Sequence, residues 1–263
     1  MAQPVDSTKP GGSLNSKHIL VVRPLRQDDQ FITLLERAGA EVSHRPVLTI
    51  EPIGDSSGVT ESQAIKNLIL EVDNFQKAIV VSGNAAELAL DWLDRYWPMM
   101  PVGIEFFAVG QQTAQTLAAA GIKALVADGR QNSEALLELS QLQDLSDQRI
   151  IIFRGCGGRE ILAETLIERG ARIDYCELYR REIVAQQALA ARQQLPQVDC
   201  LVAHSGEMLR AIGDISAAPG ADTLVVVPGE RVAGIARELG YQRIVSAENA
   251  LPEAMLAAVE KAV

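Results

Sequence analysis

Residues 150–182 read IIIFRGCGGREILAETLIERGARIDYCELYRRE, and residues 19–51 repeat their pattern as ILVVRPLRQDDQFITLLERAGAEVSHRPVLTIE. Each stretch begins with an apolar run that ends in an arginine, Arg154 in one copy and Arg23 in the other. A polar turn, an amphipathic segment and a second extended run follow in the same order. The two stretches predict two copies of one strand–helix–strand unit.

Two further pairs of stretches repeat in the same way. Residues 79–90 (IVVSGNAAELAL) resemble residues 201–212 (LVAHSGEMLRAI), and residues 106–127 resemble residues 225–246. Any two strand–helix units share a simple apolar pattern, which explains one such pair but explains three ordered pairs poorly. We therefore interpret the chain as an internal duplication, which predicts two lobes and a cleft between them. The glycines that keep the register of the copies are Gly39 with Gly170, Gly110 with Gly229, and Gly121 with Gly240.

Short continuous apolar runs predict the strands of parallel sheets, because such strands are covered on both faces. An amphipathic helical pattern follows each run. In the first of these helices Phe31, Leu34, Leu35 and Ala38 form one apolar stripe, and Gly39 ends it. Strands that alternate with helices indicate a doubly wound α/β architecture, present here twice. The predicted strands are Ile19–Val22, Ala78–Val81, Glu105–Val109, Ile150–Phe153, Cys200–Ala203 and Thr223–Val227, with weaker candidates at Ala124–Ala127 and Arg243–Ser246.

Two extended stretches interrupt this alternation and predict connectors between the lobes. They are residues 44–52 (HRPVLTIEP) and residues 174–183 (DYCELYRREI), and we expect no helix directly after either. Connectors at these places make the lobes interleaved and form a two-stranded antiparallel hinge, which alone is only marginally stable. The predicted division is a disordered lead-in at residues 1–17, one discontinuous lobe of residues 18–43 plus 184–263, and a second lobe of residues 53–173.

Composition excludes several classes of function. The net charge of −10 argues against a nucleic-acid or membrane-surface partner, for which a basic face is expected. No apolar run approaches the ~20 residues of a membrane span, and residues 1–17 lack the apolar centre of a secretion signal, so we expect a cytoplasmic protein. The absence of a long apolar surface stripe favours a monomer. The three cysteines form no C-x-x-C motif and the three histidines have no metal-ligand spacing, so we predict structural thiols and no metal.

The predicted carboxyl ends of the strands carry similar Gly, Ser, Thr and Asn residues. Ligands of open parallel sheets bind beyond these ends, where backbone amides at helix N-termini attract anions. A helix cap explains each segment taken alone. The whole set, facing one cleft, predicts a site for a ligand with many carboxylates or phosphates. The residues of this predicted binding site are Arg23, Ser82, Gly83, Asn84, Gly110, Thr113, Asn132, Ser133, Arg154, Gly155, Arg159, Ser205, Gly206, Pro228 and Arg231.

Motifs for other chemistries are absent from the sequence. Gly155, Gly157 and Gly158 begin a dinucleotide-like pattern, but Glu160 stands where G-x-G-x-x-G requires its last glycine. The chain has neither a G-x-x-x-x-G-K-[ST] phosphate loop nor a G-x-S-x-G nucleophile elbow. We therefore predict no nucleotide cofactor and no serine hydrolase site.

Several of these segments together resemble the uroporphyrinogen-III synthase family, and the resemblance extends in order from residue 18 to residue 263. It implies two flavodoxin-like lobes joined by a two-stranded ladder, with the first strand–helix unit in the lobe that the C-terminal residues complete. It also implies a cofactor-free enzyme of tetrapyrrole synthesis. The segments that carry the resemblance are RGCGGRE (154–160), ERGARIDYCELYRRE (168–182), AVGQQTAQTLAAAG (108–121), NSEALL (132–137) and VPGERVAGIARELG (227–240).

The implied substrate is hydroxymethylbilane, a linear tetrapyrrole with eight carboxylates. Loss of its terminal hydroxyl gives an azafulvene cation, and attack by the substituted α-carbon of the last pyrrole gives a spiro intermediate that reopens and recloses with that ring inverted. Cyclisation without the enzyme gives the uninverted isomer. The resemblance therefore implies a protein that acts chiefly by orienting the substrate.

The resemblance also implies roles for individual residues. Tyr179 matches the tyrosine of the family pattern and is the best candidate general acid, because a phenol keeps its proton at neutral pH. The alternative is that Tyr179 packs against the substrate or the ladder. Thr113 matches a family position and would donate its hydroxyl to the substrate. The arginines that would pair with substrate carboxylates are Arg23, Arg154, Arg159 and Arg231, although other members have threonine in place of Arg231.

A second class of function stays open at this point. A two-lobed protein that binds an anionic metabolite without chemistry, as in a sensor domain, would show the same fold-level signals. No DNA-binding element in the sequence supports that alternative.

Overall fold

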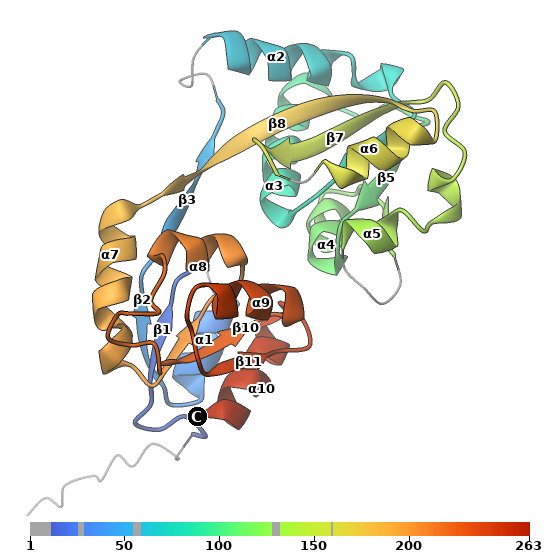
Figure 1. Cartoon of the computed structure of the whole chain (residues 1–263). Helices are drawn as coiled ribbons and strands as arrows, with labels where there is room; N and C mark the ends of the chain where they lie inside the picture. The colour runs from blue at the N-terminus through green and yellow to red at the C-terminus, as the bar shows by residue number, and fades with distance from the viewer. Residues whose placement is uncertain (1–11, 26–28, 55–58, 128–131, 159) are drawn as a thin grey trace, which may run out of the picture. The chain divides into compact units, whose positions relative to one another are not determined.

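The computed structural model describes residues 12–25, 29–54, 59–127, 132–158 and 160–263 (Figure 1). The chain folds as two compact units, each with its own sheet. Unit 1 comprises Met1–Thr49 and Glu182–Val263, and unit 2 comprises Ile50–Arg181. Arg159, one of the predicted binding residues, lies outside the described residues, as do most of the predicted lead-in residues.

Unit 1 contains a five-stranded parallel sheet in the order β11-β10-β9-β1-β2. Side chains alternate between its two faces. On one face Ile19 and Val21 pack with α1 and α10, and on the other Leu20 and Val22 pack with α7, α8 and α9. The strands are β1 (His18–Val21), β2 (Glu41–His44), β9 (Cys200–Val202), β10 (Leu224–Val227) and β11 (Ile244–Ser246). The helices are α1 (Gln30–Arg37), α7 (Ala185–Gln194), α8 (Gly206–Ile212), α9 (Glu230–Glu238) and α10 (Pro252–Ala262), with a 3-10 turn at Leu195–Gln197.

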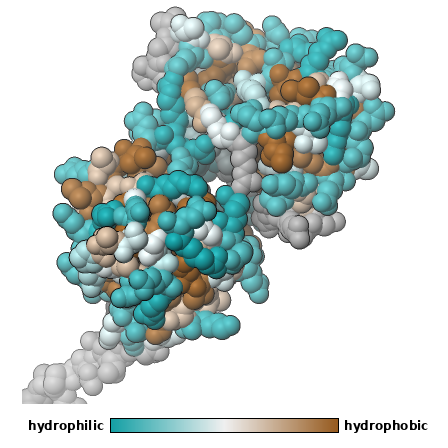
Figure 2. All heavy atoms as spheres, in the orientation of Figure 1, coloured by the Kyte–Doolittle hydropathy of each residue, from teal (hydrophilic) through white to brown (hydrophobic). Residues whose placement is uncertain are grey.

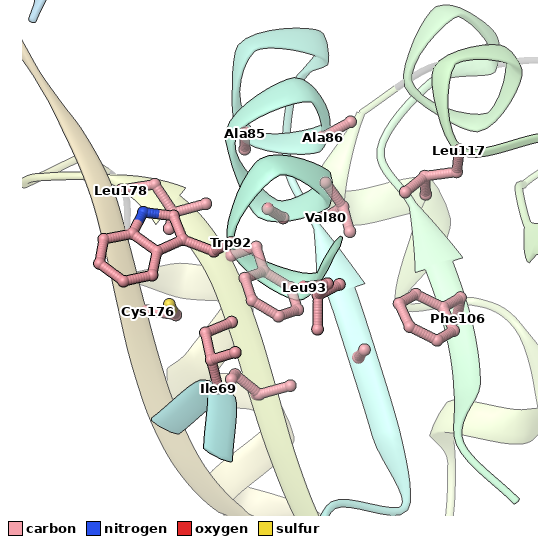
Figure 3. Close-up of a cluster of buried hydrophobic side chains, with 14 of the residues drawn as sticks. Ile69, Val80, Ala85, Ala86, Trp92, Leu93, Phe106, Leu117, Cys176 and Leu178 are labelled. Carbon is pink, nitrogen blue, oxygen red and sulfur yellow. The ribbon is translucent and has the colours of Figure 1, made fainter. Parts of the chain in front are cut away.

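Unit 2 contains a six-stranded sheet in the order β3-β8-β7-β4-β5-β6. Apolar side chains again fill both faces. In Figure 3, Trp92 from α3 points toward β8, which contributes Cys176 and Leu178 to the same cluster. The strands are β3 (Leu48–Pro52), β4 (Lys77–Val80), β5 (Glu105–Ala108), β6 (Ala124–Leu125), β7 (Arg149–Gly155) and β8 (Arg172–Ile183). The helices are α2 (Val59–Leu70), α3 (Gly83–Tyr96), α4 (Gln111–Ala119), α5 (Ser133–Leu136) and α6 (Ile161–Glu168), with 3-10 turns at Val72–Asn74 and Ser140–Leu142.

The two sheets have the same strand order once the sequence repeat is used to align them. The repeat pairs β1 with β7, β2 with β8, β9 with β4, β10 with β5 and β11 with β6. With this pairing both sheets read 2-1-3-4-5, the flavodoxin-like order, and unit 2 adds β3 beside β8. Among the repeated strands of unit 2, β4 comes first in the chain, and β7 and β8, the equivalents of β1 and β2, come last. The predicted doubly wound α/β fold, present twice, is confirmed.

The glycines of the repeat adopt matching backbone conformations. Gly39 and Gly170 end equivalent helices with φ values of +94° and +96°. Gly121 and Gly240 do the same with +80° and +88°. These values lie in the left-handed region that glycine tolerates, so the repeated glycines stop the helices as the sequence predicts.

The predicted connectors differ from the observed elements. Residues 41–44 form β2, an ordinary parallel partner of β1, and only residues 45–47 separate β2 from β3. Strand β8 is 12 residues long because its first half continues the sheet beside β7. Helix α7 begins at Ala185, directly after β8, where no helix was expected.

β3 and the last part of β8 pair as an antiparallel ladder. Ile53 N donates to Leu178 O at 2.8 Å and Val184 N donates to Val47 O at 3.0 Å, so one strand's numbering rises as the other's falls. The boundaries between the units, at residues 49/50 and 181/182, fall within these two strands.

The surface and the N-terminal residues add two observations. On the face shown in Figure 2, hydrophilic residues cover most of each unit and hydrophobic residues gather in smaller patches.

Leu14 is fully buried in the cluster with α1 and α10, and its N–H donates to Ala38 O at 2.9 Å. The packed part of unit 1 therefore begins before residue 18, the boundary expected from the sequence.

Candidate active site

The carboxyl ends of the unit 2 strands lie at one edge of the sheet, because β7, β4, β5 and β6 run parallel in adjacent positions. Helices α3 and α4 begin at this edge. Ser82 caps α3, and its Oγ accepts a hydrogen bond from Ala85 N at 3.1 Å. Gly110 precedes α4 with φ at +92°, a conformation that favours glycine. The edge thus carries the first backbone amides of two helices, which attract anions.

Asn132 and Ser133 also lie at a helix start. Asn132 Oδ1 accepts a hydrogen bond from Ala135 N at 2.9 Å and so caps the short helix α5, in which Ser133 is the first residue. The structure confirms the predicted helix start at these residues. In this structure the Asn132 side chain caps the helix.

Tyr179 and Ser82, two predicted site residues, are in contact. Tyr179 Oη lies 3.1 Å from Ser82 Oγ, although the residues belong to β8 and to the loop after β4. Only 3% of Tyr179 is exposed, whereas Ser82 is partly exposed. Backbone pairing adds a second restraint, since Cys156 N donates to Tyr179 O at 2.7 Å. The phenol is therefore held in one place at the carboxyl edge of the sheet.

Gly155 leaves room for the ring of Tyr179. A Cβ at residue 155 would lie 2.5 Å from Tyr179 Cε2 and 2.6 Å from Cζ. The two residues face each other across a shift in the β7–β8 register, which follows Arg154. The sequence suggested that Gly155 lets the backbone approach a ligand. In the structure the glycine accommodates a side chain of the protein itself, and the approach of a ligand to its backbone stays a prediction.

Arg154 is buried and bonded within its own loop. Its Nε donates to Gly155 O at 3.2 Å, its Nη2 donates to Gly157 O, and its Nη1 lies 3.4 Å from Glu160 Oε1. The guanidinium also lies 4.6 Å from the centre of the Tyr175 ring. Tyr175 donates to Glu160 in turn, and burial, followed by this hydrogen bond, raises the pKa of Tyr175 to about 12. Arg154 therefore orders the loop after β7, and its pairing with a substrate carboxylate stays a prediction.

Thr113 has a different environment from the one expected. It is 3% exposed, and its hydroxyl donates to Val109 O at 3.1 Å within the first turn of α4. A hydroxyl hydrogen used in this way is not directed at a substrate. In this arrangement Thr113 stabilises the turn that presents the amides of α4, and a hydrogen bond from its hydroxyl to a ligand stays a prediction.

Arg23 of unit 1 is also buried in local contacts. Its Nε lies 3.3 Å from Asp29 Oδ2, and its Nη1 lies 3.3 Å from His204 Nε2. His44 bonds to its backbone, with Nε2 at 2.8 Å from Arg23 O. Asp29 also caps α1, since its Oδ1 accepts from Phe31 N at 3.1 Å. Arg23 therefore fastens the end of β1 to the start of α1.

The ion pairs of Arg23 and Arg154 repeat across the two units. Each arginine ends the first strand of its repeat, and each pairs with the acidic residue that immediately precedes the following helix, Asp29 or Glu160. The spacing from arginine to acid is the same in both copies. The pair was not anticipated from the sequence. The equal spacing was the available signal.

The remaining predicted residues of unit 1 lie at the carboxyl ends of β9 and β10. Ser205 precedes α8 without a side-chain cap, and Gly206 is buried, with a Cβ position 2.3 Å from Ile235 Cδ1. Pro228 is partly exposed before α9, and Arg231 is exposed in its first turn. These residues lie at the predicted edge of the sheet. Gly206 is needed for packing between α8 and α9.

Gly83 and Gly229 differ from the packed glycines. A Cβ at either residue would meet no heavy atom within 4 Å, so open space lies beside the backbone at the start of α3 and of α9. Asn84, the second residue of α3, is partly exposed. A ligand can approach the backbone at these two helix starts without displacing a side chain.

Other kinds of site are not seen among the described residues. No group of three or more His, Cys, Asp or Glu side chains there has the geometry of a metal site. Burial raises the pKa of the Cys200 thiol to about 12 and also raises that of Cys176, as expected of structural cysteines. The helices within the described ranges include none with the length and apolar content to cross a bilayer.

Comparison with known proteins places the chain in a family. The family model described as uroporphyrinogen-III synthase HemD matches residues 29–257. The chain is 32% identical to the uroporphyrinogen-III synthase of Escherichia coli (strain K12) over 255 residues, which cover 92% of this chain and 99% of the relative. It is 38% identical to the synthase of Salmonella typhimurium over 176 residues, covering 63% and 70% of the two chains.

The fold agrees with a solved structure of the same family. A mutant uroporphyrinogen III synthase from the extremely thermophilic bacterium Thermus thermophilus superposes with a TM-score of 0.64 at 19% identity, covering 94% of this chain and 98% of the other. At that identity the superposition shows the fold alone. The family model and the full-length similarity to the E. coli enzyme carry the assignment, and the chain belongs to the uroporphyrinogen-III synthase family.

Proposed function

We propose that this chain is a uroporphyrinogen-III synthase, which closes hydroxymethylbilane into uroporphyrinogen III with inversion of the last pyrrole ring and loss of water. Membership of the family over nearly the whole chain is the observation that carries this proposal. The reaction needs a protic group near the leaving hydroxyl and a scaffold that holds a polyanion in one pose. Both features fit the carboxyl edges of the sheets.

The scaffold part of the function uses backbone amides more than arginines. The chain carries a net charge of −10, so a substrate with eight carboxylates meets an overall repulsive field. Local positive ends of helices offset this repulsion without added cations. The starts of α3 and α9, where Gly83 and Gly229 leave open space, are the places we propose for substrate carboxylates.

Twelve of the predicted binding residues then fall into two groups. Ser82, Gly83, Asn84, Gly110 and Arg231 are partly exposed or stand at helix starts, and we propose that they contact the substrate together with Ser205 and Pro228. The buried residues, by contrast, hold the loops that present these groups. This second group contains Arg23, Thr113, Arg154, Gly155 and Gly206.

The chemical part of the function depends on a proton donor at this edge, and we propose that the Tyr179 phenol is the source of that proton. Its hydroxyl lies at the carboxyl edge in contact with Ser82. The cation that follows loss of water needs no covalent partner in the protein. Orientation of the bilane then decides which carbon attacks, and effects of this kind contribute several kcal/mol in well-oriented reactions.

The experiment that tests this proposal resolves porphyrin isomers. Purified protein is mixed with freshly generated hydroxymethylbilane, the products are oxidised, and the type I and type III porphyrins are separated. We expect type III to predominate with the protein and type I without it. An isomer ratio equal to that of the protein-free control would contradict the proposal and favour the metabolite-binding alternative.

Three further expectations from the sequence stay predictions. They are a cytoplasmic location, a monomeric state and the absence of a nucleic-acid partner. The acidic net charge supports the last of these, because phosphate backbones require a basic surface.

A further inference from the structure

We propose that Ser82, rather than Tyr179, delivers the proton to the leaving hydroxyl of the substrate, and that Tyr179 lies behind it as the source of the next proton. The inference rests on the proposed function and deepens it by naming the group that touches the reacting oxygen. Three observations carry it: the contact between the two hydroxyls, their different exposure, and the occupancy of the Ser82 oxygen.

The hydrogen-bond capacity of Ser82 gives the direction of the relay. A serine hydroxyl has one hydrogen to donate and two acceptor positions. Ala85 N donates to Ser82 Oγ at 3.1 Å, which fills one acceptor position. Tyr179 Oη lies at 3.1 Å and fills the second when the phenol donates. The single hydrogen of Ser82 is then directed away from both partners, toward a third oxygen.

Exposure decides between the two possible directions. If Ser82 donated to the phenol, the hydrogen of Tyr179 would have to reach the substrate, yet Tyr179 is 3% exposed. Ser82 is partly exposed, and open space lies beside the backbone of the adjoining Gly83. A bulky tetrapyrrole therefore reaches the serine hydroxyl more readily than the phenol behind it.

The pair is held rigidly enough to act as a unit. Helix capping fixes the rotamer of Ser82, because the cap bond to Ala85 ends if the side chain rotates. The ring of Tyr179 packs against the backbone of Gly155, in the space that a Cβ at residue 155 would fill. The Arg181 guanidinium, 6.0 Å from the centre of the ring, supplies positive charge for the phenolate that the relay leaves.

Protons balance over the reaction. Ser82 gives its hydrogen to the hydroxyl oxygen of the substrate as the C–O bond breaks, and water departs. Tyr179 passes its proton to Ser82 Oγ and becomes a phenolate. When the ring-closing carbon loses its proton to restore the last pyrrole, that proton returns through Ser82 to Tyr179. No other reactant is required.

The test compares Ser82→Ala, Tyr179→Phe and the double variant by kcat and KM for hydroxymethylbilane. A relay predicts that each single variant lowers kcat by about 10²-fold with little change in KM, and that the double variant is no slower than either, because residues that act as a unit are not additive. A kcat for Ser82→Ala within twofold of wild type, or losses that multiply in the double variant, would overturn the relay.

Matched variants separate the relay from helix capping. Ser82→Asn keeps a capping oxygen but lacks the hydroxyl, so we expect wild-type stability with the low kcat of Ser82→Ala. Ser82→Thr keeps the hydroxyl and should restore kcat to within about threefold of wild type. Thr165→Ala removes a hydroxyl that donates to Ile161 O within α6 and serves as the activity control. An active Ser82→Asn variant would overturn the relay.

The activity of the wild-type chain distinguishes failure of the proposed function from failure of the relay alone. A wild-type chain that yields no excess of the type III isomer overturns the proposed function and the relay with it. An active wild type whose Ser82 variants behave like Thr165→Ala overturns the relay alone and leaves Tyr179 as the direct acid.

Discussion

At the residue scale, the space above Gly155 determines where Tyr179 lies. The Tyr179 ring stands where any other residue would place its Cβ, so a methyl group there must displace the ring or the strand. The phenol would then leave Ser82, and with it the contact on which the proposed proton transfer depends. A glycine inside a strand is otherwise unfavourable, so its presence in β7 has a packing reason.

Gly155→Ala should therefore lower both stability and activity. Overpacking of this kind costs about 1–3 kcal/mol, and displacement of the phenol should lower kcat by a factor similar to that of Tyr179→Phe. Urea unfolding and the isomer assay measure the two effects. Gly234→Ala in α9 is the matched control, because its Cβ meets nothing within 4 Å and should raise stability by about 0.5–1 kcal/mol. Equal behaviour of the two variants would contradict this account of Gly155.

The cysteines give a second prediction at this scale. Cys176 and Cys200 are buried, and burial raises the pKa of both thiols, whereas Cys156 is partly exposed and its pKa is raised by burial and by Glu177. We expect an alkylating reagent at pH 8 to modify Cys156 slowly and the other two only after unfolding. Peptide mass spectrometry identifies the modified residue. Rapid modification of Cys176 or Cys200 in the folded protein would contradict the burial described here.

At the scale of elements, the repeated arginine–acid pair joins the end of a strand to the start of the next helix. The Arg23–Asp29 pair is buried, with side-chain exposures of 10% and 8%. In the Arg154–Glu160 pair the acid is 53% exposed. Solvent screens the second pair much more than the first. The same device should therefore contribute different amounts of stability in the two units.

Asp29→Asn and Glu160→Gln test this difference. Asn retains the helix cap at residue 29 but removes the counterion of a buried arginine, which we expect to cost about 3 kcal/mol. Glu160→Gln should cost about 1 kcal/mol or less. Free energies of unfolding from urea titrations measure both changes. Equal losses from the two substitutions would show that burial does not set the strength of these pairs.

Much of the fold was predictable from local sequence patterns at this scale. The eight predicted strands all exist, with ends shifted by one or two residues in most cases, because buried apolar runs and helix-stopping glycines are local signals. The full length of β8 was missed. The first half of β8 pairs with β7 and its last part with β3. The sequence of β8 alone does not identify either partner.

The site was less predictable, because its contacts join residues that are far apart in the chain. Sequence reasoning selected both Ser82 and Tyr179 but gave no reason to bring their hydroxyls together. It took Arg23, Arg154 and Thr113 as ligand contacts because polar residues at strand ends often bind ligands. Burial and local hydrogen bonds depend on the folded surroundings, and they give these side chains partners within the protein that sequence reasoning did not anticipate.

At the scale of the whole molecule, one strand order occurs twice within a single chain. Unit 2 lies between the two segments of unit 1 in the sequence, so the C-terminal residues complete unit 1. Strands β3 and β8 each contribute residues to both units. Internal duplication thus supplies two sets of helix starts without a second chain. We therefore expect a monomer to be sufficient for the proposed function.

Light scattering during size-exclusion chromatography tests the monomeric state. We expect a mass near 28.4 kDa that does not change over a tenfold range of protein concentration. A mass near twice that value would show that a second chain belongs to the functional protein.

The central claim is that this chain catalyses the inverted ring closure, and a turnover measurement with limiting protein tests it most directly. Hydroxymethylbilane is supplied in about 100-fold excess over the chain, and type I and type III products are counted per protein molecule. The account predicts that type III product exceeds one equivalent many times over and remains the main isomer. Type III product that stops at one equivalent, or an isomer ratio equal to that without protein, would contradict it.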